Sequence, residues 1–470
     1  MSTRPISAVL LFVSFVSGCD GGAAGTPDMS VSPSLPAWER GLSVTRDLYP
    51  ARRGLREARG IIHLHSVNSH DACDGKPRPG GKPAEPCNQD LRDALCITHQ
   101  DYAMLTDHDD NMADHPWDEL FTPMAGDEKV MVDGRHVASW LACPDGHRVL
   151  LQIGGENEVM PLGLEEHVSE DIQARHDLMN GSDATAIAAF RAHGALVAFA
   201  HTESHPAEQL RMAKADCTEV YNLHANLDPR IREPMGLDPA GAILGLAPFL
   251  TPRDDGPTSD LAFLGFAETL PAEWGPYHTI LSEGTRITGT AGTDAHENVF
   301  SGLMADGERG DSYRRMLRWF SNHILVDEIT PAKVKAAIKG GRLFVVFEVF
   351  GGAKGFDVRA ETKKGIAEIG DEVALADAPE IVVEAPRFDL APGQVAPVLR
   401  VKIVLADRPE GTEVASSDGA APLRFKPTKP GAYRTEVRIT PNHLIGYMGS
   451  AKPKLLREFA FILANPIYVK

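Results

Sequence analysis

Two histidines at the end of an apolar run are the first sign of chemistry in this sequence. Residues 60–65 read Gly-Ile-Ile-His-Leu-His, so two isoleucines lead directly into His63 and His65. Residues two apart in a β-strand point to the same side, and both imidazoles should project from the carboxyl end of one buried strand. His70 and Asp71 follow, which puts four side chains of the kind that bind divalent metals within nine residues.

Similar side chains follow four further apolar runs. In chain order these runs lead into Asp107-His108, Glu156 with His167 eleven residues later, His201, and Asp294-Ala295-His296. In parallel α/β folds, functional groups gather where the strands end at their carboxyl edge. Five strand ends of this kind therefore predict one shared metal site rather than scattered surface histidines.

The chain divides into segments of different character. Residues 56–340 alternate short apolar runs with helical patterns, which favours an α/β domain with a parallel sheet. One helix is predicted over residues 330–339, where Thr330 is a cap and Pro331 the first helical residue. Residues 341–470 contain short β-rich runs separated by Gly, Pro and Asp turns, typical of a small antiparallel β-sandwich. Seventeen of the 18 histidines precede residue 341, so we expect the chemistry in the first domain.

The N-terminus has the pattern of an exported bacterial lipoprotein. Residues 1–19 combine Arg4 with an apolar stretch too short to span a bilayer, and they end in Ser-Gly-Cys19, which resembles a lipidation signal. Residues 20–55 form a tether, rich in Gly, Ser and Pro up to about residue 36, and a lead-in to the first domain. We therefore expect a periplasmic or cell-surface protein that is attached to a membrane only through an N-terminal lipid.

Charge and cysteine content narrow the functional classes. The formal charge of −18 leaves no basic surplus for phosphate backbones, which argues against a nucleic-acid partner. Five cysteines remain after Cys19, so at least one thiol is free. Cys73 and Cys87 bracket a loop rich in Gly, Pro and Lys, and we expect a disulfide between them, which an exported compartment permits.

The ordered motifs H-L-H, T-D-H, G-G-E, A-H and T-D-A-H resemble those of the PHP (polymerase and histidinol phosphatase) superfamily of metallohydrolases over roughly residues 56–300. This resemblance implies a distorted (β/α)7 barrel that holds two or three divalent metals (Zn, Mn or Fe) at the carboxyl ends of its strands. The matching positions imply these metal ligands: His63, His65, His108, Glu156, His167, His201, Asp294 and His296.

The resemblance leaves three positions to be placed. An Asp or His is expected shortly after the second histidine, and both His70 and Asp71 qualify, with Asp71 ranked ahead. Glu158 competes with Glu156 but fits the G-x-E pattern less well. Asp107 is expected to support a ligand rather than to bind metal.

The S-H-D-A-C-D-G loop, the β-rich tail and the closing Asn-Pro-Ile-Tyr-Val look like an exported branch grouped with carbaryl-hydrolase-type enzymes.

Such a cluster predicts a hydrolase of a small-molecule substrate, with a metal-bridging hydroxide as the nucleophile and no separate catalytic side chain. The sequence has no G-x-S-x-G elbow and no P-loop. A phosphoesterase is the leading prediction. The alternatives are a carbamate, amide or ester hydrolase with the same cluster, and a non-catalytic lipid-anchored binding protein.

Further side chains are candidates for the substrate pocket. A phosphate substrate favours an arginine clamp, for which Arg253 and Arg309 are candidates. His205, Glu203 and His224 follow the ligand-bearing strands closely and are candidates to shape the pocket or to relay protons.

Overall fold

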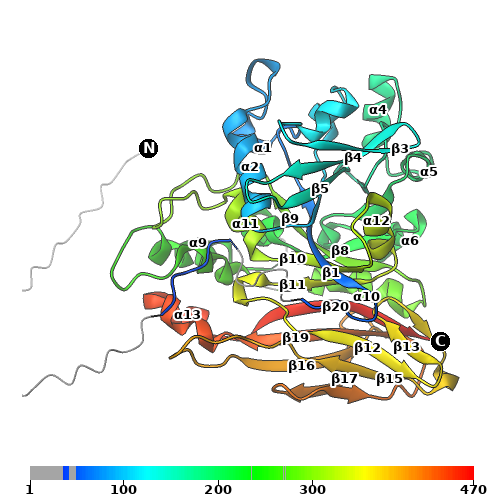
Figure 1. Cartoon of the computed structure of the whole chain (residues 1–470), viewed down its shortest axis with the longest axis vertical. Coiled ribbons are helices and arrows are strands. Elements are labelled where there is room, and N and C mark those ends of the chain that lie inside the picture. Colours follow the sequence, from blue (N-terminus) through cyan, green and yellow to red (C-terminus); the bar gives the residue numbers. More distant parts are fainter. Residues whose placement is uncertain (1–34, 42–48, 234–235, 268, 270) are drawn as a thin grey trace, which may run out of the picture.

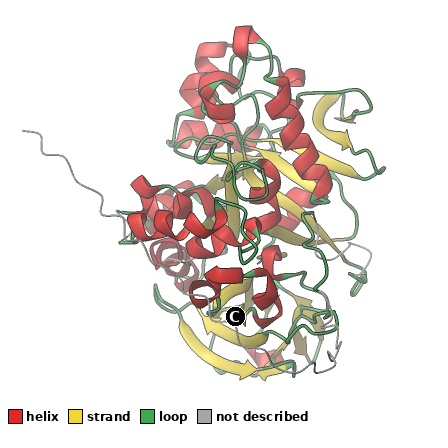
Figure 2. Cartoon of the chain, turned by 90° about the vertical axis from the view of Figure 1, so that its left-hand side faces the viewer, coloured by secondary structure: helices red, strands yellow, loops and turns green. Residues whose placement is uncertain are grey.

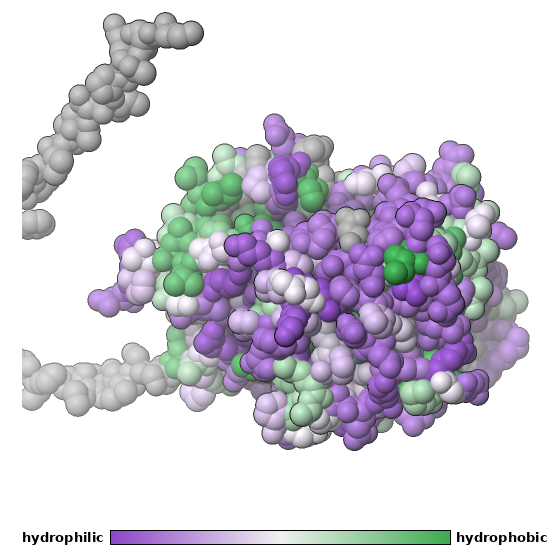
Figure 3. All heavy atoms as spheres, turned by 90° about the horizontal axis from the view of Figure 1, so that it is seen from above, coloured by the Kyte–Doolittle hydropathy of each residue, from purple (hydrophilic) through white to green (hydrophobic). Residues whose placement is uncertain are grey.

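The computed structural model describes residues 35–41, 49–233, 236–267, 269 and 271–470. The predicted signal peptide, Cys19 and the tether up to residue 34 lie outside these residues. No helix in the described part of the chain is long and apolar enough to cross a membrane. Seen from above, the surface is mainly hydrophilic (Figure 3), in keeping with the acidic composition.

Strand β1 (Arg56–Leu64) is the centre of the fold (Figure 1). Every residue after Arg56 in it is buried, and it pairs in parallel with β2 and β9 and antiparallel with β10. Strands buried in this way are expected to read as apolar runs. The strands that carry candidate ligands at or near their ends, or lie between those strands, are β2 (Tyr102–Leu105), β5 (Arg148–Ile153), β6 (Met160–Leu162), β7 (Leu196–Phe199), β8 (Cys217–Asn222) and β9 (Thr288–Ala295).

These strands lie in the order β6-β7-β8-β9-β1-β2-β5, parallel except for β6. The predicted closed (β/α)7 barrel is not confirmed, because the sheet does not close. Strand β6 spans three residues and forms its ladder with β7, while an isolated bridge between Ile153 and Leu164 and a hydrogen bond from the Gly155 amide to the Pro161 carbonyl connect this edge to the end of β5 without a ladder. Beyond β5 the sheet continues into the antiparallel pair β4 (Arg135–Ala142) and β3 (Glu128–Val132).

Helices cover the strands described so far, whereas strands predominate at the bottom of the view in Figure 2. Some of these helices begin at a side-chain cap: Asp183 accepts hydrogen bonds from the Thr185 and Ala186 amides, and Thr330, the predicted cap, accepts one from the Lys333 amide. The helices are α1 (Ala72–Gly75), α2 (Glu85–Ile97), α3 (Asp109–Met112), α4 (Ile172–Met179), α5 (Ala184–Ala192), α6 (Ala207–Ala213), α7 (Leu223–Leu227), α8 (Pro229–Arg232), α9 (Pro239–Gly245), α10 (Pro271–Ser282), α11 (Tyr313–Trp319), α12 (Pro331–Lys339) and α13 (Lys452–Leu455).

The C-terminal strands continue the same sheet through β10 (Ser321–Val326), which pairs with β1 and with β11 (Leu343–Val346). The sheet therefore runs without interruption across residue 341, where a new domain was predicted. Its further strands are β20 (Phe459–Val469), β19 (Gly431–Thr440), β16 (Val398–Leu405), β17 (Thr412–Asp418) and the short β14 (Glu372–Val373). A second sheet has the order β13 (Gly365–Glu368), β12 (Asp357–Thr362), β15 (Glu380–Glu384) and β18 (Leu423–Phe425).

Two buried asparagines bond the first half of β9 in place of a neighbouring strand. Asn465 of β20 accepts from the Gly289 amide and donates to the Gly289 carbonyl, and it also bonds the Tyr277 hydroxyl and the Leu343 carbonyl. Asn322 of β10 bonds the amide and the carbonyl of Ala291 in the same way. Both side chains satisfy backbone groups that would otherwise be buried without partners, and they fix the strand that carries Asp294.

Disulfides join Cys73 to Cys87 and Cys96 to Cys143, and Cys217 is a buried free thiol. The first pair is the one expected from the sequence, and it ties the loop after His65 to α2. The second pair was not anticipated. Burial raises the pKa of the Cys217 thiol well above its ordinary value, so this residue stays uncharged and belongs to the core.

A buried charge network beside β10 predicts acid sensitivity. Burial alone would raise the pKa of Glu348, but the charge of Arg59 and a hydrogen bond from His323 lower it to about 2. Because the folded-state pKa is depressed, Glu348 stabilises the fold above its unfolded pKa, and this contribution is lost as the pH falls towards 2. We expect a loss of about 3 kcal/mol of unfolding free energy from this group between pH 5 and pH 2.

Denaturant unfolding of the wild type and of Glu348→Gln across this pH range measures that loss. The variant should be less stable at pH 7 and its stability should fall less steeply below pH 5. Parallel curves for the two proteins would contradict the role given to Glu348.

Candidate metal centre

Eight side chains from six strand ends and the segments after them converge on one cluster. Their positions follow from the topology, since β1, β2, β5, β7, β8 and β9 run parallel and bring their carboxyl ends to one edge. The converging residues are His63, His65, His108, Glu156, His201, His224, Asp294 and His296, and the loop after β1 adds Asp71.

Two carboxylates lie at the centre of the cluster. Glu156 Oε2 is 3.0 Å from Nε2 of both His63 and His65, and Asp294 Oδ1 is 3.2 and 3.3 Å from the same atoms. The second oxygen of each faces His201, whose Nε2 is 3.3 Å from Glu156 Oε1 and 3.1 Å from Asp294 Oδ2. Each carboxylate thus presents both oxygens to imidazole nitrogens, an arrangement in which it can bridge two cations.

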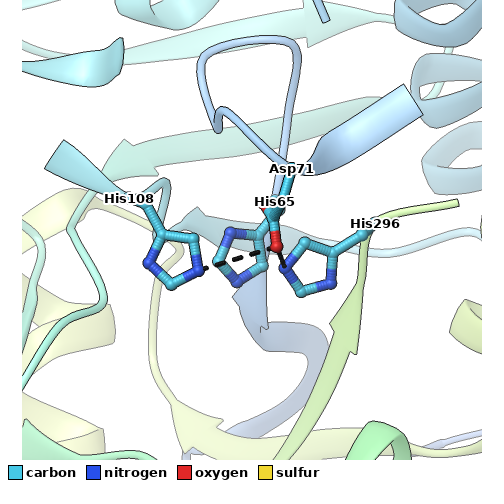
Figure 4. A group of neighbouring side chains, drawn as sticks. All are labelled: His65, Asp71, His108 and His296. Atoms are coloured by element: carbon cyan, nitrogen blue, oxygen red, sulfur yellow. Dashed lines mark ion pairs between the residues drawn. The ribbon is translucent and has the colours of Figure 1, made fainter. Parts of the chain in front are cut away.

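A second group of ligand atoms surrounds Asp71 (Figure 4). The Asp71 Oδ2 atom is 3.2 Å from His296 Nε2 and 3.8 Å from His108 Nε2, and the rings of His65 and His296 stack with centroids 3.8 Å apart. His70 is exposed, and its ring contacts the outside of His108. Of the two alternatives in this turn, the structure brings Asp71 into the cluster.

His167 was predicted to bind metal, and this prediction is wrong, because His167 lies away from the cluster. His167 Nε2 donates to the His115 carbonyl at 2.9 Å, and its ring packs edge-on against Trp117, in a surface groove apart from the cluster. His224 lies against the cluster instead, with Nδ1 3.6 Å from Asp294 Oδ2. Strand β6 lies between Glu156 and His167 and leads the chain away from the site. His224 lies two residues after the end of β8. This position just after a strand was the sequence feature that could have identified His224 as a member of the cluster.

The expected substrate-binding residues also lie away from the pocket over the cluster. Arg309 bonds Asp74 and Asp311, the exposed Arg253 pairs with Asp255, and His205 bonds Gln209. The pocket itself has a volume of about 710 Å³ and is lined by six of the cluster residues and by Asp71, Asp228, Pro229, Arg230, Ile231, Asn298 and Val299. Residues of α8 and of the segment after β9 therefore form its rim.

Unpaired buried atoms show that the cluster fits a cation. Nε2 of His63, His65 and His296 and Oδ1 of Asp294 are buried and make no well-oriented hydrogen bond among the described residues, although each lies 3.0–3.3 Å from an oppositely charged group of the cluster. Ligand atoms that face one another at this distance without forming regular hydrogen bonds leave room for an ion between them. Three imidazole nitrogens and a carboxylate oxygen are ligands that Zn²⁺, Mn²⁺ and Fe²⁺ accept.

In five histidines of the cluster, Nδ1 forms a hydrogen bond with another protein group. This hydrogen bond turns the Nε2 atom of each ring towards the cluster. His63 Nδ1 bonds Glu219 at 2.7 Å, His65 bonds Ser69, and His201 bonds Glu203. His108 and His296 bond the carbonyls of Glu156 and Asp294. Metal-binding histidines are oriented in this way. Asp107 accepts from the amide and hydroxyl of Ser66, so it braces the β1 loop and does not face the cluster.

Charge holds the cluster together. Burial alone would raise the pKa of Glu156 and Asp294, but the charge of His63 holds both pKa values well below their usual range. Burial would lower the pKa of His63, yet the two carboxylates hold it well above its ordinary value. Burial and the charge of His65 lower the pKa of His296 to about 3. The carboxylates are therefore ionised, and a divalent cation would take the place of the imidazole protons.

The backbone departs from regular strand geometry at the ligands. His63, His201 and Asp294 have φ values of 70°, 47° and 51°, the left-handed region that costs a non-glycine residue about 1–3 kcal/mol. Beside them, Gly292 leaves room for the Glu219–His63 contact, because a methyl group there would collide with the Glu219 carboxylate. Strain of this kind concentrates at functional sites.

Glu219, which the sequence did not reveal, should control metal affinity. It is buried on β8, bonds His63 Nδ1, and also accepts from the His201 amide at 2.9 Å. Glu219→Gln removes the charge that supports the His63 ring, so we expect metal affinity to fall about 10–100-fold. Competition with a chromogenic chelator measures this. Glu283→Gln, a surface carboxylate paired with Arg211, is the matched control, and equal affinities in the two variants would refute the role.

No family model matches the sequence, and no curated protein matches it significantly. Among solved structures, the chain is similar to a two-domain protein from Bacteroides vulgatus that contains a predicted PHP-like metal-dependent phosphoesterase, with 11% identity, 88% of this chain and 97% of that chain covered, and a TM-score of 0.34. It is also similar to PsfC from Pseudomonas syringae, with 12% identity, coverage of 62% and 91%, and a TM-score of 0.32. Neither likeness carries an argument about function, and the metal centre stands on its own contacts.

Proposed function

We propose that this protein is a metal-dependent hydrolase whose cluster binds two or three divalent metals, Zn, Mn or Fe. The observation that carries the proposal is the set of buried, unpaired Nε2 and carboxylate atoms that face one another at the ends of the parallel strands. A binding protein has no need for so many convergent ligands. The ordered motifs that resemble the PHP superfamily support the same conclusion.

The residues fall into overlapping groups, which supports more than one metal. His63, His65, Glu156 and Asp294 form one group, His65 shares a second with Asp71, His108 and His296, and Asp294 shares a third with His224 and His296. Glu156 and Asp294 can bridge, and the histidines fix the positions around them. Divalent metals bound here would lower the pKa of a water and stabilise negative charge on the substrate.

A phosphoester is the substrate class that we favour. The pocket over the cluster is large enough for a small molecule at about 710 Å³, and it carries an arginine at its rim. A carbamate, amide or ester hydrolase is the second candidate, because Asp71 belongs to the S-H-D-A-C-D-G loop that resembles carbaryl-hydrolase-type enzymes, and the Cys73–Cys87 disulfide holds that loop.

Parallel assays on the metal-reconstituted full chain test this proposal. We expect hydrolysis of p-nitrophenyl phosphate that depends on Zn²⁺ or Mn²⁺ and is lost on chelation. Hydrolysis of a p-nitrophenyl carbamate instead would favour the second candidate. No metal-dependent hydrolysis of phosphate monoesters, phosphate diesters, carbamates or esters would refute the proposed function.

We also propose that the chain is exported as a lipoprotein through Cys19. The two disulfides support export, since disulfides persist in oxidising compartments. Incorporation of labelled palmitate that is abolished by Cys19→Ser would be the expected result, and equal labelling of the variant would refute it.

A further inference from the structure

One arginine stands at the rim of the metal pocket. Arg230 of α8 is the only Lys or Arg side chain among the described residues that line the pocket. Its side chain is 88% exposed, so a ligand that enters the pocket can reach its charge. The two arginines that the sequence suggested, Arg253 and Arg309, pair with carboxylates elsewhere. Arg230 therefore remains as the cation that a substrate would meet.

Asp228 holds one edge of the guanidinium. Arg230 Nε is 3.1 Å from both Asp228 carboxylate oxygens, and Nη2 is 2.5 Å from Oδ2. The Arg230 amide also donates to Asp228 Oδ1 at 2.8 Å, which fixes the backbone of the pair. The other terminal nitrogen, Nη1, bonds no described residue. Asp228 thus orients the arginine and leaves its Nη1 edge available to a ligand.

The pair is also linked to the metal centre. Asp228 Oδ2 lies 3.7 Å from His224 Nε2, and the other nitrogen of that ring lies 3.6 Å from Asp294 Oδ2. The arginine is therefore placed relative to the cluster by two side chains rather than by loop backbone alone. A group held in this way can select among substrates, because its position is set before binding.

We propose that Arg230 is a specificity-determining residue that recognises a phosphate monoester through its Nη1 edge. The proposal rests on the proposed hydrolase function and deepens it by naming the substrate class. A phosphate monoester carries three terminal oxygens and up to two negative charges, so it offers acceptors for the arginine as well as for a metal held by the cluster. A diester has one terminal oxygen and one charge fewer, and a neutral ester or carbamate offers no anionic oxygen. Arginine–phosphate hydrogen bonds are charge-assisted and strong.

Steady-state kinetics of the metal-loaded full chain test this role with p-nitrophenyl phosphate, bis-p-nitrophenyl phosphate and p-nitrophenyl acetate. For Arg230→Gln we expect KM for the monoester, and the inhibition constant of inorganic phosphate, to rise about 10–100-fold, with kcat changed much less. KM for the acetate should not change. Arg230→Lys should recover part of the loss, since it restores the charge without the planar edge. Arg253→Gln is the matched control and should behave as wild type.

The possible failures are distinguishable. If the wild type hydrolyses the monoester and Arg230→Gln leaves KM and phosphate inhibition unchanged, the role of Arg230 is refuted while the hydrolase stands. An equal rise of KM for the acetate would mean that the substitution disturbs the pocket generally, and it would also refute the role. A wild type that acts on the diester or the acetate but not on the monoester overturns the substrate class. A wild type that is inactive on all three and also on a p-nitrophenyl carbamate refutes the proposed function.

Discussion

Asp294→Asn should lower kcat/KM for p-nitrophenyl phosphate by about 10³-fold or more. The Asp294 carboxylate faces His63 and His65 with one oxygen and His201 with the other, so it is shared between groups of ligands. An amide carries no charge and turns one of these positions into a donor. The several kcal/mol that a bound metal contributes to the transition state would be lost, at 1.36 kcal/mol per tenfold in rate.

Asp255→Asn is the matched control, since Asp255 is an exposed carboxylate outside the cluster. Kinetics and thermal unfolding should be measured on both variants at the same metal concentration. Activity within tenfold of wild type in a folded Asp294→Asn protein would contradict the assignment of this residue as a bridging ligand.

Asn465→Ala should destabilise the protein by about 4 kcal/mol. Its side chain makes four buried hydrogen bonds, to both backbone groups of Gly289, to Tyr277 and to Leu343. Each partner left unpaired costs about 1–3 kcal/mol, and the sum is reduced because neighbouring groups relax together. The loss would loosen β9 where it meets the C-terminal strands.

Denaturant unfolding of Asn465→Ala beside Asn442→Ala measures this effect. Asn442 makes one exposed bond to the Ala396 carbonyl, so its replacement should cost about 0.5 kcal/mol or less. Equal stabilities of the two variants would show that the amide of Asn465 does not anchor β9.

The candidate metal centre could be located from the sequence because its candidate ligands lie at strand ends. An apolar run that ends in His or Asp is visible without knowledge of the partners, and parallel topology brings such ends together. His63, His65, His108, His201 and His296 were placed by this reasoning. His63 and His65 both face the cluster, as their i, i+2 spacing predicted, although the positive φ of His63 interrupts the regular strand at that point.

The errors arise where tertiary contacts decide the outcome. His224 follows β8 by two residues, whereas His167 lies eleven residues after Glu156, and only the path of β6 shows that His167 turns away. Glu219 lies inside β8, where alternation alone cannot tell a core carboxylate from a supporting one. Arg230 lies in the short helix α8, which Asp228 caps, and the position of this helix over the pocket depends on the fold of residues 223–232 as a whole.

The arrangement of the sheet was the least predictable feature. The closed barrel required a ladder between β5 and β6, but β6 pairs with β7 and is connected to β5 only by isolated backbone hydrogen bonds. The C-terminal strands were expected to form a separate sandwich, yet β10 and β11 join them to β1 in one sheet. Pairing between strands far apart in sequence leaves no local signal, because the side-chain pattern of a buried strand is the same whichever neighbour it has.

Metal content of the purified full chain tests the central claim most directly. After reconstitution with Zn²⁺ or Mn²⁺ and removal of excess ion, elemental analysis should find two to three equivalents per chain for the wild type and fewer for Asp294→Asn. Less than one equivalent in the wild type would contradict the account, because the buried, unpaired ligand atoms of His63, His65, His296 and Asp294 would then have no ion to bind.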